Sequence, residues 1–179
     1  MVQTLVTVLP NVEVVLLPSG NYAIRTDLSR VVSRMEFWSE IVEEVQLTAT
    51  AQDLAITGGN VVVAIPDGAT VVRAVTCFKF GAIENTNVGA NEIEATAQDI
   101  EVKELTAGTF IDAIDITQGA FKLAASTREG GDIIIGDIDV KAEVDANGTY
   151  AFQWKAAEAI LGNLQFNNVQ MGLLVYFMT

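Results

Sequence analysis

Hydrophobic and polar residues alternate in short runs from about Val45 onward, and segments rich in Gly or Asn separate these runs. In "EVQLTATAQ" the apolar positions are Val45, Leu47, Ala49 and Ala51, with polar residues between them. Successive side chains of a strand point to opposite faces of a sheet, so this period of two predicts half-buried β-strands. We therefore expect an all-β chain, an antiparallel β-sandwich of jelly-roll-like form with at most one or two short helices.

The strongest strand pattern lies in "IIIGDIDVKAEVD", residues 133–145, where apolar residues hold every second position and acidic residues dominate the other face. The turn signal "DANG" and the pattern "TYAFQWK" follow, which predicts a hairpin over residues 133–155 with "STREGGD" as an exposed loop before it. A tight turn is expected at Pro66-Asp67-Gly68. Further strands are expected in "VVVAI", "TVVRAVTCFKF", "DIEVKE", "FIDAIDI" and "AFKLAA".

Two segments depart from strict alternation. The stretch "DLSRVVSRMEFWSEIVEEV" has apolar residues at helical spacing, which predicts a helix from Asp27 to about residue 42 and a strand by Glu43. The stretch "KAAEAILGN" predicts a short helical turn that ends at Gly162. We expect residues 1–34 to form an N-terminal arm that runs into the short helix, and residues 35–179 to form the sandwich.

The C-terminal segment "LQFNNVQMGLLVYFMT" has two apolar faces whose pattern slips at Asn167-Asn168, which predicts a bulge or kink. Beyond the slip, one face is wholly apolar, whereas the other begins with Gln170 and ends with apolar residues. The first face is expected to join the core, and a neighbouring subunit or the apolar N-terminal arm is expected to cover the second. The predicted oligomer interface is Leu174, Tyr176 and Met178.

Composition supports buried surface beyond one core. Half of the 179 residues are hydrophobic, only 18% are charged and the mean hydropathy is +0.36, which is high for a soluble monomer. The net charge of −13 argues against binding to nucleic acid or to anionic membranes. Arg25, Arg30 and Arg34 lie close together in the sequence and form a candidate docking patch for an acidic surface.

The residue inventory argues against an enzyme. The chain has no His and a single cysteine, Cys77, whose strand pattern predicts a buried thiol. Asp137, Asp139 and Glu143 could be read as a Ca²⁺ site, but a solvated strand face is the favoured interpretation. We expect no catalytic residue, no cofactor, no bound metal and no membrane-spanning segment, since polar residues interrupt the uncharged stretch 159–179.

An aromatic row on one predicted strand leaves two interpretations open. Tyr150, Phe152 and Trp154 share one face of "TYAFQWK". Such a row can stack on sugar rings, or it can fill the core of the sandwich, which is the interpretation we favour.

Three stretches, "IPDGATVVRAVTCFKFGAIENTN", "STREGGDIIIGDIDVKAEVD" and "GTYAFQWK", together resemble tailed-phage virion structural proteins, in particular capsid decoration (auxiliary or cement) proteins of β-sandwich type. The resemblance covers under half of the chain and carries over no functional residue. It implies a non-enzymatic bacteriophage protein that forms homo-oligomers, commonly trimers, binds other virion proteins and resides in the virion after assembly in the host cytoplasm. The alternatives are a carbohydrate-binding β-sandwich module and a tail-tube or baseplate subunit.

Overall fold

The computed structural model shows an all-β chain, which confirms the predicted β-sandwich class. It describes residues 12–16, 22–26, 32–47, 53–86, 93–94, 98–116, 122–124, 126–156 and 164–179. Strands and their connections account for these residues, and no helix occurs within the described ranges.

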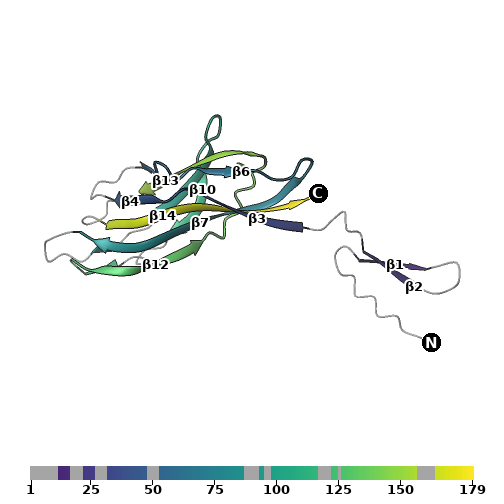
Figure 1. Ribbon diagram of the computed structural model, residues 1–179, viewed down its shortest axis with the longest axis horizontal. Coiled ribbons are helices and arrows are strands. Elements are labelled where there is room, and N and C mark those ends of the chain that lie inside the picture. Colours follow the sequence, from purple (N-terminus) through teal and green to yellow (C-terminus); the bar gives the residue numbers. More distant parts are fainter. Residues whose placement is uncertain are drawn as a thin grey trace.

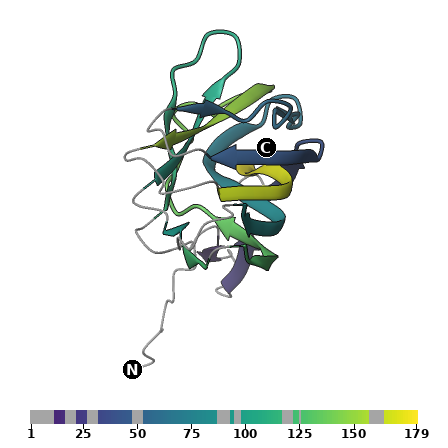
Figure 2. The same cartoon turned by 90° about the vertical axis from the view of Figure 1, so that its left-hand side faces the viewer.

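The first large sheet, sheet I, is built around the long C-terminal strand. Strand β14 pairs with β7 along one edge, and β12 lies beyond β7. Along its other edge β14 pairs with β4 near its start and with β3 near its end, and Figure 2 shows β14 between β3 and β7. The bounds are β3 (Val32–Trp38), β4 (Val42–Leu47), β7 (Thr70–Asn85), β12 (Arg128–Ile135) and β14 (Leu164–Met178).

The second large sheet, sheet II, packs against sheet I. Its strand order is β10, β9, β13, and then β5 and β6, which pair with different parts of β13. All of these pairings are antiparallel. The bounds are β5 (Leu54–Ala55), β6 (Val61–Val63), β9 (Gln98–Glu104), β10 (Ile111–Ile116) and β13 (Gly148–Ala156).

Two small sheets complete the described structure. Strands β8 (Ile93–Glu94) and β11 (Lys122–Leu123) form one of them. Strands β1 (Val12–Leu16) and β2 (Tyr22–Thr26) form the other, an antiparallel hairpin that lies apart from the two large sheets (Figure 1). The hairpin precedes β3, which begins at Val32, ahead of the arm boundary expected at residue 35.

The core lies between the two large sheets, and aromatic rings fill its centre. Phe78 and Phe166 of sheet I meet Trp154 of sheet II, with ring centroids 5.2 to 5.8 Å apart. Tyr150, Phe152 and Trp154 are at most 1% exposed. The core interpretation of this aromatic row is therefore confirmed, and the row is not a surface platform for a sugar.

The helix predicted over residues 27–42 is wrong for its described part. Residues 32–38 and 42–47 are strands β3 and β4, both paired with β14. Between them the chain bends at Ser39, whose N–H donates to the Met171 carbonyl at 2.9 Å and whose hydroxyl accepts from the Met171 N–H at 3.0 Å. Partners on β14, more than 130 residues away in sequence, satisfy this backbone and override its helical spacing. The turn predicted at "KAAEAILGN" falls mostly on 157–163, outside the described residues.

The hairpin predicted over residues 133–155 is also wrong. Strand β12 contains "REGGD", which was expected to be a loop, and it ends at Ile135, while β13 pairs with β9 of the other sheet. The connecting segment bends because side-chain oxygens replace a strand partner: Asp139 Oδ1 accepts from the N–H groups of Ala74 (3.0 Å) and Lys141 (3.1 Å). Val140 and Val144 are fully buried and lie one turn apart, since the Val144 N–H donates to the Val140 carbonyl. The alternation of apolar and acidic residues in this segment therefore belongs to a loop that crosses from one sheet to the other. Buried valines and the Asp139 hydrogen bonds hold this loop in place.

The predicted slip at Asn167-Asn168 is confirmed. Asn168 has a φ of 54°, and Gly81 on the neighbouring strand lies so close that a Cβ there would be 3.1 Å from the Asn168 Cβ. The alternation of β7 is interrupted at the same level. Phe80 and Ile83 are three positions apart and would face opposite sides of a regular strand, yet both are buried in the core. The turn expected at Pro66-Asp67-Gly68 is present as well, closed by a hydrogen bond from the Ala69 N–H to the Pro66 carbonyl.

Candidate interaction surface on the outer face of sheet I

The register of sheet I places apolar residues on the face that points away from the core. On β14, Met171, Leu173 and Val175 face the core, so Leu174 and its even-numbered neighbours face outward. Residues paired with them in the antiparallel ladders share that outward face. We call the resulting set the outer apolar face; it comprises Val32 and Trp38 of β3, Val75 and Cys77 of β7, Ile133 and Ile135 of β12, and Leu174, Tyr176 and Met178 of β14.

Trp38 and Gly172 form the closest approach on this face. The two residues are paired in the β3–β14 ladder, and a Cβ at position 172 would lie 2.7 Å from two atoms of the indole ring. The absence of a side chain at Gly172 therefore lets the Trp38 ring lie against the strand beside it. The indole is still 36% exposed, so it presents a large apolar surface to whatever lies outside.

A small second core forms beneath the exposed side chains. Val75, Cys77 and Leu174 are at most 7% exposed, and Tyr176 packs against them, separate from the main core. Burial, followed by the nearby carboxylate of Glu36, raises the pKa of the Cys77 thiol to about 11. Cys77 is thus buried, as predicted, but in this outer cluster and in an unreactive state.

The centre of the face continues into exposed apolar residues on both flanks. Ile133 and Ile135 on β12 are 50% and 60% exposed, and Val32 on β3 is 50% exposed. Several exposed apolar residues gathered on one sheet face are typical of sites where proteins contact each other, because single scattered ones are common but groups of them are not. The outer apolar face is therefore the strongest candidate for a functional surface in the described structure.

Charged residues lie beside and within the outer apolar face, and two of them are cations on β7. Arg73 is paired with Tyr176, and Lys79, paired with Gln170, donates to its side-chain oxygen at 3.3 Å. Arg34 and Glu36 lie between Val32 and Trp38 on β3 and form an exposed ion pair, with 2.8 Å between nitrogen and oxygen. Arg73 and Lys79 thus place positive charge beside the apolar residues of β7 on a chain of net charge −13, which favours an acidic partner.

The structure places the predicted interface residues on this one face. Leu174, Tyr176 and Met178 lie on it. Leu174 is already buried within the single chain, by its neighbours in the small second core, and does not depend on a partner for its burial. Of the predicted docking patch, Arg34 lies on the face, Arg25 lies in β2 and Arg30 falls outside the described residues. The sequence analysis missed Trp38 as part of this surface, because the apolar residues around it have helical spacing. Only the pairing of β3 with β14 places Trp38 on the outer apolar face.

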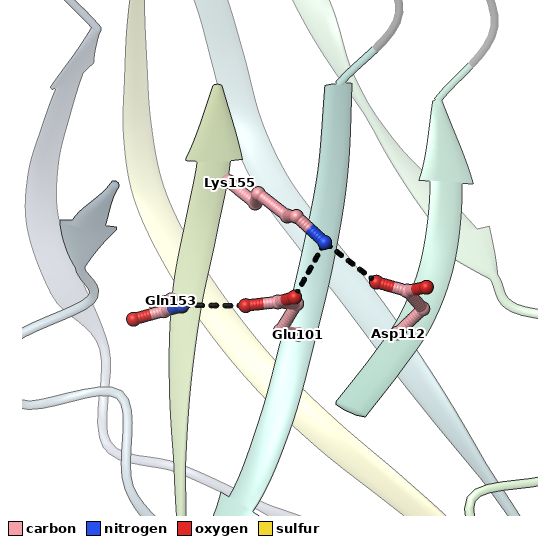
Figure 3. A network of polar contacts seen from close by, with 4 residues as sticks. All are labelled: Glu101, Asp112, Gln153 and Lys155. Atoms are coloured by element: carbon pink, nitrogen blue, oxygen red, sulfur yellow. Dashed lines mark hydrogen bonds and ion pairs between the residues drawn. The ribbon is translucent and has the colours of Figure 1, made fainter. Parts of the chain in front are cut away.

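The outer face of sheet II is polar by contrast. Figure 3 shows Glu101 of β9, only 6% exposed, where it accepts hydrogen bonds from Gln153 and Lys155 of β13, while Lys155 also contacts Asp112 of β10. These hydrogen bonds from Lys155 to the two carboxylates raise the pKa of its ammonium group. Burial, and then Asp112 nearby, raise the pKa of the Asp99 carboxyl on the same face. Sheet II thus presents a surface that is compatible with water on its own.

Two of the three acidic residues considered for Ca²⁺, Asp139 and Glu143, accept hydrogen bonds from the backbone. Asp139 accepts the two N–H groups described above, and Glu143 Oε1 accepts the Glu104 N–H of β9 at 2.6 Å. Among the described residues, no group of three or more carboxylates or thiols is placed to hold a metal ion. The described part of the chain also contains no helix long and apolar enough to cross a membrane.

Comparisons with known proteins identify no family for the chain. No protein-family model matches it, and no curated protein matches it. Among solved structures, Eiger TNF from S. frugiperda is 6% identical with a TM-score of 0.39, and the match covers 79% of this chain and 92% of that one. The virus-like particle of the Macrobrachium rosenbergii extra small virus, from the giant freshwater prawn, is 11% identical with a TM-score of 0.19, and the match covers 83% of this chain and 80% of that one. Likenesses at these scores carry no functional argument, so function has to be argued from the surface itself.

Proposed function

We propose that the chain is a non-enzymatic structural protein that assembles into a homo-oligomer through the outer apolar face and decorates a viral capsid. The observation that carries the proposal is the contrast between the two outer faces. Apart from Val62, sheet II presents mainly charged and amide side chains on its outside, whereas sheet I exposes Trp38, Ile133 and Ile135 together. A surface of this kind in contact with water is a liability, and burial against a partner removes it.

A second copy of this chain is the favoured partner. The cations Arg73 and Lys79 of β7 attract an acidic protein, and the chain itself carries a net charge of −13. The high overall hydropathy also supports permanent association, because obligate interfaces are richer in apolar residues than transient ones.

The experiment compares lysine substitutions that differ only in their location. Ile135→Lys and Met178→Lys add a charge to the outer apolar face at residues that are not deeply covered, so the fold should persist while the oligomer dissociates. Val62→Lys is the matched control, since Val62 is 64% exposed on β6 of sheet II. Light scattering coupled to size-exclusion chromatography measures the mass of each variant.

Two further variants test the assignment of faces. Leu173→Lys and Val175→Lys should unfold the domain, because both side chains are fully buried in the main core and an unpaired charge there costs several kcal/mol against a total stability of about 5 to 15 kcal/mol. A wild-type chain that is monomeric at all concentrations would refute self-association. An oligomer that survives both Ile135→Lys and Met178→Lys would place the interface elsewhere.

The viral location rests on the resemblance of the three quoted stretches to capsid decoration proteins. Mass spectrometry of purified virus particles tests it, because a decoration protein is present in particles at stoichiometric amounts. Negative-stain images of the purified oligomer distinguish this role from that of a tail-tube subunit: compact trimers agree with decoration, and stacked rings would favour the tail.

A further inference from the structure

We infer that the β1–β2 hairpin of one copy covers the outer apolar face of a second copy. This inference rests on the proposed function, because it names the part of the partner that occupies the interface. It unites two features of the described structure, namely a sheet face that no other described strand covers and a hairpin that forms a sheet of its own.

The ladder of the hairpin has one apolar face. Residues that are paired in an antiparallel ladder lie on the same face, and the register pairs Val14 with Ile24 and Leu16 with Tyr22. The alternate positions of the ladder pair Glu13 with Arg25, two residues of opposite charge, and Val15 with Ala23, which are smaller apolar residues. The face of Val14, Ile24, Leu16 and Tyr22 is therefore the more apolar of the two, and it is the face expected to pack on another sheet.

The hairpin needs such a cover for its stability. A two-stranded hairpin is at best marginally stable in water by itself, and it becomes stable when its apolar face packs against another layer. In the described structure the two strands form a sheet of their own, which lies beyond the Val32 end of β3 and away from sheets I and II (Figure 1). A hairpin in that position can meet the outer apolar face of a neighbouring molecule.

The chain connection brings the hairpin to the correct edge. Five residues, 27–31, separate the end of β2 from Val32, and a connection of this length spans at most about 20 Å. Val32 is itself part of the outer apolar face, and it is paired with Met178, the last residue of β14. Stacked layers lie about 10 Å apart, so the hairpin can reach across to a neighbour that abuts this edge while it stays tethered to its own sheet.

In such an exchange, the hairpin of one copy contacts the outer apolar face of the next copy, so the two contacting surfaces differ. When the copies close into a ring, one hairpin covers each outer apolar face. A symmetric contact between two outer apolar faces would instead leave every hairpin uncovered. The two arrangements predict different behaviour for variants of the hairpin, which provides the test.

The test uses full-length chains that carry single lysine substitutions. Ile24→Lys adds a charge to the apolar face of the hairpin ladder, and Val15→Lys adds the same charge to the other face, as the matched control. Ile135→Lys adds it to the outer apolar face of sheet I. Light scattering should show Ile24→Lys and Ile135→Lys each at the mass of a single chain, 19.2 kDa for the wild type, while Val15→Lys remains oligomeric. Far-UV circular dichroism should show that the strands of the two large sheets persist in all three, with at most the small loss that the short hairpin strands account for in the two monomeric variants.

A mixing experiment then decides the inference. The Ile24→Lys chain retains an intact outer apolar face and the Ile135→Lys chain retains an intact hairpin, so an equimolar mixture should form a complex of twice the monomer mass. The inference is overturned if Ile24→Lys remains oligomeric or if the mixture stays monomeric. A wild-type monomer would overturn the proposed self-association itself, whereas a wild-type oligomer that depends on Ile135 but not on Ile24 would overturn only the role of the hairpin.

Discussion

The indole ring of Trp38 lies directly over Gly172, so close that a single methyl group at position 172 would come within 2.7 Å of it. Two residues that are far apart in the sequence thereby meet on the outer apolar face, where β3 pairs with β14. The glycine is what allows a side chain as large as tryptophan to lie on the strand without displacing it.

Gly172→Ala is expected to displace the Trp38 ring and weaken the oligomer. The added methyl group overpacks the site, which should cost about 1 kcal/mol in the free energy of unfolding and weaken association about tenfold. Tryptophan fluorescence should shift to longer wavelength, because Trp38 becomes more exposed while the only other tryptophan, Trp154, stays fully buried. Gly130→Ala is the control, since a Cβ at Gly130 meets no atom within 4 Å and should leave both measurements unchanged.

Cys77 is expected to resist thiol reagents in the native protein. Its thiol is 1% exposed and has a pKa of about 11, so only about one molecule in a thousand carries the thiolate at pH 8. Labelling with a maleimide should therefore follow unfolding in urea. Trp38→Ala should accelerate labelling without urea, because Cys77 is the ladder partner of Gly172, which Trp38 covers. Rapid labelling of the native wild type would contradict the burial of Cys77 in the small second core.

Thr76→Val is expected to stabilise the protein. The Thr76 hydroxyl is fully buried and has no hydrogen-bond partner within the described part of the chain. Valine has nearly the same shape and needs no partner, so the substitution should raise the free energy of unfolding by about 1 kcal/mol. Urea denaturation measures the change, and Thr70→Val, at an exposed position of the same strand, should leave the stability nearly unaltered. A loss of stability in Thr76→Val would indicate that the hydroxyl is satisfied.

Asp99→Asn is expected to stabilise the protein at neutral pH and to have no effect in acid. The folded state raises the pKa of Asp99, first by burial and then through Asp112 and Asp115, so the ionised carboxylate opposes folding. Above its folded-state pKa this unfavourable contribution is fully present, and asparagine removes it. Below the ordinary carboxyl pKa of about 3.9 the group is protonated in both states, and the difference vanishes. Urea midpoints at pH 7 and near pH 3 measure the effect, and an equal gain at both values would exclude an electrostatic cause.

The alternation of residue types alone determined much of the fold. Strands over "VVVAI", "TVVRAVTCFKF", "DIEVKE", "FIDAIDI" and "TYAFQWK" follow from a period of two, as does the slip at Asn167-Asn168. These features are local, because a strand buried on one face needs apolar residues at every second position wherever its partners lie. The same argument placed Leu174, Tyr176 and Met178 on the face opposite the core.

Only the tertiary structure decided how the strands pair and where two of them end. The pattern around Met35 and Trp38 suits a helix as well as a strand, and pairing with β14 selected the strand. The acidic run after Ile135 alternates as a strand does, yet Asp139 captures backbone N–H groups and bends it into a crossing loop. Both outcomes depend on hydrogen-bond partners far away in the sequence, and so does the approach of Trp38 to Gly172. Local periodicity contains no information about those partners, which is why the surface that we propose as functional became visible only in the folded chain.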